Sequence, residues 1–106
     1  MKVKGFFDKP EEVVLRLGRY ARHNNLAIRL ITKSGEPWTT MTVNLDEKLP
    51  SNYAYVDVNN FAEAEEFIQT YSLGTYTGLY SRSGYVNYPL YKFDLEQLRK
   101  YEREDS

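Results

Sequence analysis

The sequence predicts an α+β domain in which one antiparallel sheet of about four to five strands carries two helices packed on one face. Three observations predict this class. Several short segments alternate apolar and polar residues with the period of two that is typical of strands. Two later segments place apolar residues three or four positions apart behind cap-like residues, as helices do. Glycines and prolines separate the segments, and 106 residues are enough for a single domain over residues 1–106.

The first two strands are expected over residues 13–21 and 26–32, which both alternate apolar and polar side chains. Asn24 and Asn25 lie between them, and asparagine tolerates the positive φ of a tight turn. We therefore expect an antiparallel hairpin. A helix over residues 9–22 is the alternative, because two acidic residues near its start have capping-box spacing. An internal glycine opposes that helix by about 1 kcal/mol relative to alanine.

Two further strands are expected over residues 38–45 and 53–58. The first of them is rich in β-branched and aromatic residues, with Met41 and Val43 on one face. The second alternates apolar side chains with polar ones, and its alanine and valines are expected to face inward.

A helix is expected over residues 61–72, where apolar residues recur on one side. Asn60 stands at its cap position with a glutamate three residues later, and Gly74 stands where a helix end favours positive φ. A second helix is expected to open at Asp94, with Gln97 as its capping-box partner.

Between these helices lies a segment, residues 72–95, that holds five tyrosines and little charge. Residues 79–81 are expected to pair with residues 85–88. Tyrosine offers a large contact area at low entropic cost, and it is favoured at protein interfaces. We expect Tyr71 and Tyr91 to be structural, and we predict that partner-binding residues come from the glycine-rich part of the segment: Tyr76, Tyr80, Arg82 and Tyr85.

The residues predict no catalytic, cofactor-binding or metal-binding site. The chain has no cysteine and one histidine, His23, which is expected to lie exposed in a turn without a role. No nucleophile-elbow or phosphate-binding glycine motif occurs. Three glutamates, at positions 63, 65 and 66, are expected on the solvated side of the first helix. We therefore expect a protein that is not an enzyme and needs no cofactor.

The cations are concentrated near the start of the chain, although the net charge is only −1. Residues 13–34 contain five Lys or Arg and no acid. Arg16, Arg22 and Arg29 are candidate nucleic-acid contacts, because arginine on a sheet face can hold phosphates. The alternative is a charged sheet face that keeps the protein soluble. No apolar run is long enough for a membrane span, so we expect a cytoplasmic protein, a monomer or a dimer, without membrane contact.

The runs "NLAI", "GEPW…TVNL", "VDVNN…AEEFI" and "YPLYKFDL" resemble a family of small bacterial proteins of unknown function. That family is carried on conjugative elements, plasmids and phages of Firmicutes and Bacteroides, and the likeness extends from Leu15 to Leu98. It implies no catalytic motif, so no residue inherits a role. It does imply an inhibitor of host defence, similar to anti-CRISPR proteins, whose partner is Cas9 or a Cas9–guide RNA complex. The alternative is a nucleic-acid-binding accessory protein of plasmid or conjugative-element maintenance.

Overall fold

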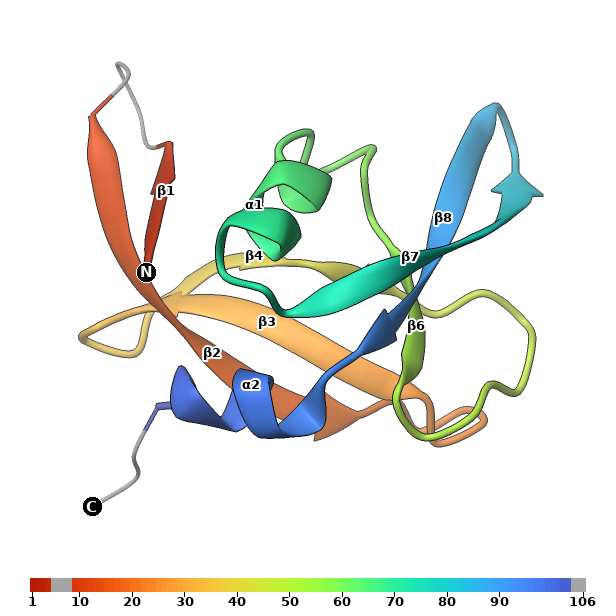
Figure 1. Cartoon of the computed structure of the whole chain (residues 1–106), viewed down its shortest axis with the longest axis horizontal. Coiled ribbons are helices and arrows are strands. Elements are labelled where there is room, and N and C mark those ends of the chain that lie inside the picture. Colours follow the sequence, from red (N-terminus) through yellow and green to blue (C-terminus); the bar gives the residue numbers. More distant parts are fainter. Residues whose placement is uncertain (5–8, 104–106) are drawn as a thin grey trace.

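The structure is a computed structural model that describes residues 1–4 and 9–103 (Figure 1). The described residues form two four-stranded antiparallel sheets and two short helices. The first sheet has the strand order β1 (Lys2–Lys4), β2 (Pro10–Arg19), β3 (Leu26–Thr32) and β4 (Pro37–Thr40). The second has the order β5 (Thr42–Val43), β6 (Tyr53–Val56), β8 (Val86–Phe93) and β7 (Gly74–Ser83). The helices are α1 (Ala64–Thr70) and α2 (Leu95–Lys100).

The predicted α+β class with antiparallel pairing is confirmed, but the prediction of one sheet with both helices on one face is not. The strands divide between two sheets, with α2 packed on β2 of the first sheet and α1 near β7 of the second. One hydrophobic core draws side chains from both sheets and both helices, among them Leu15, Val56, Phe67 and Leu98. Neither helix among the described residues is long and apolar enough to cross a membrane.

The predicted first hairpin is confirmed as β2 and β3, which pair in register from Val13 opposite Thr32 to Arg19 opposite Leu26. The helical alternative for this segment is therefore wrong. Leu15, Ile28 and Leu30 are fully buried, so the alternation of the sequence reports which face of the hairpin covers the core.

The strand predicted over residues 38–45 is divided at Met41, where the chain passes from the first sheet to the second. Met41 N–H donates to the Ile28 carbonyl over 2.9 Å, and its own carbonyl accepts from Asp57 N–H over 2.8 Å. The buried hydroxyl of Thr42 then accepts from Ile28 N–H over 3.1 Å. The residues on both sides of Met41 have strand composition, so the sequence predicted a single longer strand where β4 and β5 follow each other directly.

The first helix, α1, is shorter than predicted, and its predicted caps are wrong at both ends. Glu63 occupies the N-cap without a side-chain bond, whereas the Asn60 backbone and side chain donate to the Asp57 carboxylate. This bonding holds Asn60 in a preceding turn. After the helix, Ser72 adopts the positive φ of 56° that was expected of Gly74, and Gly74 begins β7.

The second predicted helix is confirmed as α2, with Asp94 at its N-cap accepting from Gln97 N–H over 3.1 Å. Only half of the capping box forms. The Gln97 side chain donates to the Tyr71 carbonyl over 2.9 Å instead of reaching back to the cap, so it ties α2 to the end of α1.

Candidate functional site

The β7–β8 hairpin carries the most exposed large apolar side chains among residues 1–4 and 9–103. They are Tyr76, Leu79, Tyr80 and Tyr85, which are 44%, 63%, 62% and 98% exposed. All four lie within one ten-residue stretch. In Figure 1 the turn end of this hairpin projects to the upper right, away from α1 and the first sheet. We name Tyr76, Leu79, Tyr80, Arg82 and Tyr85 the hairpin surface.

Strand register places three predicted partner-binding residues on the same face of β7. Tyr76 lies opposite Tyr91, Tyr80 opposite Pro89 and Arg82 opposite Asn87. Residues at alternate positions of a strand share a face, and residues directly opposite each other do so too. The three side chains therefore continue the face on which Tyr91 is buried, but beyond the edge of the core.

A row of rings connects this face to the core. The Tyr76 ring lies 5.6 Å from that of Tyr91, which lies 6.1 Å from that of Phe93. The Tyr91 hydroxyl donates to Glu65 of α1 over 2.7 Å. Burial, followed by the hydrogen bond to Glu65, raises the pKa of the Tyr91 phenol, which stays neutral and keeps donating. The inner half of the hairpin is thus packed on the core, whereas the large side chains of its outer half are exposed to solvent.

A bulge separates the two halves of the hairpin. The pairing shifts between Tyr76 and Tyr80, where Gly78 has a φ of 85°. The Thr77 hydroxyl closes the gap by donating to the Leu90 carbonyl over 2.8 Å and accepting from Leu79 N–H over 3.2 Å. Bulges of this kind re-aim the side chains that follow them. Here the bulge leaves the side chains of Leu79 and Tyr80 exposed to solvent.

The turn of the hairpin is shorter than predicted, and Tyr85 belongs to it instead of to a strand. Ser83 pairs with Val86, which leaves Gly84 and Tyr85 as a two-residue turn. Gly84 has a φ of 62°, as tight hairpins with glycine first require. Arg82 Nε donates to the Gly84 carbonyl over 3.2 Å and so supports the turn beside the exposed ring.

In the structure Tyr91 is buried, which agrees with a structural role, and the predicted partner-binding residues are exposed. Their binding role stays a prediction. Tyr71 is half-buried, packs on the core and bonds through its hydroxyl to Lys2 of β1, in agreement with a structural role. Sequence reasoning missed Leu79. The signal was present, since its neighbours two positions away, Thr77 and Ser81, are polar and give it no apolar face to join.

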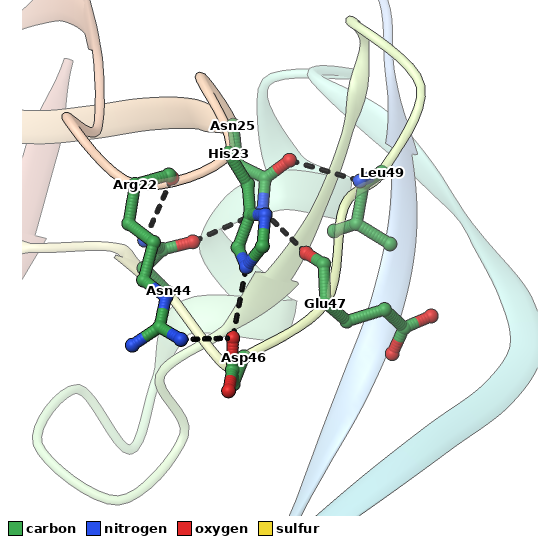
Figure 2. Close-up of polar contacts among 7 residues, drawn as sticks. All are labelled: Arg22, His23, Asn25, Asn44, Asp46, Glu47 and Leu49. Carbon is green, nitrogen blue, oxygen red and sulfur yellow. Dashed lines mark hydrogen bonds and ion pairs between the residues drawn. The ribbon is translucent and has the colours of Figure 1, made fainter.

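His23 is not the idle turn residue that was expected. It has a φ of 64° and is hydrogen-bonded through Nε2 to the Asp46 carboxylate over 2.8 Å, and Arg22 pairs with the same oxygen over 2.9 Å (Figure 2). A carboxylate only accepts, so Nε2 carries the proton. The bond from His23, with the Arg22 charge, lowers the pKa of Asp46.

Asn25 completes this contact between the first turn and the loop after β5 (Figure 2). Its buried side chain donates to Asn44 Oδ1 over 3.0 Å and to the Glu47 carbonyl over 2.7 Å, and accepts from Leu49 N–H over 2.9 Å. Every polar atom of the amide is thereby used. The cluster holds no serine, threonine or cysteine beside its histidine, and its hydrogen bonds join the two loops.

The three predicted nucleic-acid contacts are not brought together. Arg22 lies in the turn after β2 and pairs with Asp46, so it does not share the sheet face on which it was expected. Arg16 and Arg29 lie directly opposite each other on β2 and β3, and both are exposed.

The glutamates of α1 do not all face solvent. Glu63 and Glu66 are exposed as predicted, but Glu65 is half-buried on Tyr91. A hollow of about 810 Å³ beside the start of α2 is lined by Lys92, Asp94, Glu96 and eight other residues. Within the described part of the chain, no group of three or more His, Asp or Glu could hold a metal ion.

Comparison with known proteins identifies a family without assigning an activity. No curated protein and no solved structure matches the chain significantly. One family model, described as a domain of unknown function, matches residues 14–106. Since this match covers most of the sequence, the chain belongs to the DUF4313 family.

Proposed function

We propose that this protein is a non-enzymatic inhibitor of host defence that binds a Cas9-type effector, or its complex with guide RNA, through the hairpin surface. One observation carries the binding part of the proposal: the large apolar side chains most exposed to water gather on one projecting hairpin. The host-defence setting is supported by the resemblance of runs such as "YPLYKFDL" to proteins of mobile elements.

The hairpin surface has the composition of an interface centre. Single exposed apolar residues are ordinary, but a cluster of them marks interaction sites. Tyrosine and arginine are enriched among the residues that dominate binding energy, and each anchor is worth about 2 kcal/mol or more. Tyr80, Arg82 and Tyr85 supply these types beside one another.

The rigidity of the support favours binding as well. Ordering a flexible side chain on association costs about 0.5–1.5 kcal/mol, so a surface that is already ordered loses less. Tyr76 rests on Tyr91, and Tyr91 is fixed by Glu65. The proposal is therefore that the hairpin surface, which is preformed at Tyr76, occupies a surface of the effector and carries out no bond-making of its own.

A plasmid-interference assay tests the proposal. Cells carrying Cas9 of several types, programmed against a plasmid, are transformed with that plasmid while this protein is expressed. The wild type is expected to restore plasmid retention against at least one Cas9 type. The Tyr80→Ala/Tyr85→Ala variant is expected to lose the effect, whereas Arg99→Gln, on the exposed side of α2, keeps it. Interference that is unchanged against every Cas9 type would contradict the proposed target.

A second candidate is a nucleic-acid-binding accessory protein of plasmid or conjugative-element maintenance. The exposed cross-strand pair of Arg16 and Arg29 favours it. It predicts binding to nucleic acid without any effect on interference.

A further inference from the structure

Two arginines lie directly opposite each other on adjacent strands of the first sheet, and neither forms an ion pair with a described residue. Arg16 of β2 is paired in register with Arg29 of β3, and Arg29 is paired in turn with Thr40 of β4. Their chain neighbours Leu15 and Leu30 are fully buried, so the arginines project from the face opposite the core. Directly opposed residues have Cβ atoms about 4.5–5.5 Å apart. Both side chains line one hollow of the surface, so a single ligand bound there would contact both.

Two arginines near this pair in the sequence have partners, but the pair itself does not. Arg19 donates to the Ser51 carbonyl over 2.6 Å, and Arg22 pairs with Asp46. The side chains of Arg16 and Arg29 have no hydrogen bond or ion pair with any described residue. Glu102 lines a hollow with Arg16 without pairing with it. Like charges directly opposite each other destabilise a sheet, and a bound anion would remove that cost.

The surface between the arginines leaves room for such an anion. A shallow hollow of about 120 Å³ is lined by Arg16, Arg29 and Arg19, with Gly18 and Ala27 among its other residues. Gly18 has open space where a Cβ would lie. Gly18 and Ala27 lie opposite each other beside the arginine pair, and because both are small they leave the space next to the guanidinium donors open. The guanidinium fork matches phosphate oxygens in a bidentate geometry.

We infer that Arg16 and Arg29 form a second binding site, separate from the hairpin surface, that takes the phosphodiester backbone of a nucleic acid. Two cations that line one hollow match an anion that repeats at short intervals. A polynucleotide strand offers one charge per about 3.4 Å of helix axis. A peptide would need a run of acidic residues to do the same. With a net charge of −1 on the whole chain, the contact is local and weakens steeply with salt.

Fluorescence anisotropy with a labelled single-stranded RNA, and with a labelled DNA duplex, tests the site at low salt. The wild type is expected to bind at least one of these probes. The Arg16→Gln/Arg29→Gln variant is expected to bind about tenfold or more weakly, with a salt slope reduced by about 1.5 for two lost phosphate contacts. Arg99→Gln/Lys100→Gln removes the same two positive charges from α2 and is expected to bind as the wild type does. Circular dichroism checks that each variant is folded.

Three results would overturn the inference: no binding of either probe by the wild type, equal binding by the folded double variant, or displacement of the probe by polyglutamate as effectively as by unlabelled RNA. The last result would assign the site to an acidic protein. The test is independent of the proposed function, because Tyr80→Ala/Tyr85→Ala is expected to bind the probes unchanged.

Discussion

Alanine replacement of the hairpin tyrosines, one at a time, separates rings that support the fold from rings that are free to bind. Tyrosine buries about 200 Å² when fully covered, and at about 25 cal/mol/Å² its full burial stabilises by about 5 kcal/mol. Tyr91 is 1% exposed, so Tyr91→Ala is expected to lower the free energy of unfolding by about 5 kcal/mol. The corresponding values are about 3 kcal/mol for Tyr76 and about 2 kcal/mol for Tyr80, which are 44% and 62% exposed.

Tyr85 gives the sharpest expectation of the series. It is 98% exposed, so Tyr85→Ala is expected to change the free energy of unfolding by only about 0.1 kcal/mol. Urea unfolding followed by circular dichroism measures all four variants, and an unchanged slope with urea concentration confirms that the unfolding reaction is the same. A cost for Tyr85→Ala or Tyr80→Ala equal to that of Tyr91→Ala would refute the reasoning, because those rings would then be packed.

Three further predictions concern the scaffold. Gly74→Ala is expected to destabilise the protein by about 1–3 kcal/mol in urea unfolding, because its Cβ would lie 2.8 Å from the Lys92 carbonyl oxygen. Gly18→Ala is the matched control: its Cβ would enter open space, so its free energy of unfolding should stay within about 0.5 kcal/mol of the wild type. Asn25→Ala is expected to cost about 2–4 kcal/mol by the same assay, because buried partners on the facing loop lose their bonds. Burial raises the pKa of Tyr55 to about 12, above the value of about 10 in the unfolded chain. The free energy of unfolding should therefore fall between about pH 10 and pH 12, because only the unfolded chain loses this proton there. The fall should be smaller in Tyr55→Phe, which has no hydroxyl to titrate.

Strand positions were well predicted wherever one face of a segment covers the core. The β2–β3 hairpin follows directly from the alternation that ends in buried Leu15 and Ile28. What the alternation does not specify is the neighbour of each strand. Met41 shows why, because its backbone bonds, which join the first sheet to the second, depend on Ile28 and Asp57, far from it in the sequence. Local patterns therefore predicted one sheet where there are two.

Helix ends were predicted less well, since side chains with other partners replaced the expected caps. Asn60 is drawn to Asp57, and the positive φ expected at Gly74 occurs at Ser72. Gly74 is needed for a different reason, the close approach of the Lys92 backbone. That approach arises from the pairing of β7 with β8 and cannot be read from the residues around Gly74 alone.

The candidate site shows the same division. Nearness to glycines selected Tyr80 and Tyr85 as interface candidates and left Tyr91 as structural; in the structure Tyr91 is buried and the other two are exposed. The grouping of Arg22 with the strand arginines failed, because the chain had already turned and Asp46, from a distant loop, pairs with it. The role of His23 in that pairing was missed for the same reason, since it depends on a loop more than twenty positions away.

The most direct test of the central claim is the affinity of the purified protein for a Cas9–guide RNA complex, measured by biolayer interferometry. The account predicts that the wild type binds and that the folded Tyr80→Ala/Tyr85→Ala variant is weakened by about thirtyfold for each lost ring, at about 2 kcal/mol per anchor. Arg99→Gln should bind as the wild type does. Binding that is equally tight in the double variant would contradict the claim that the β7–β8 hairpin is the surface through which this protein acts.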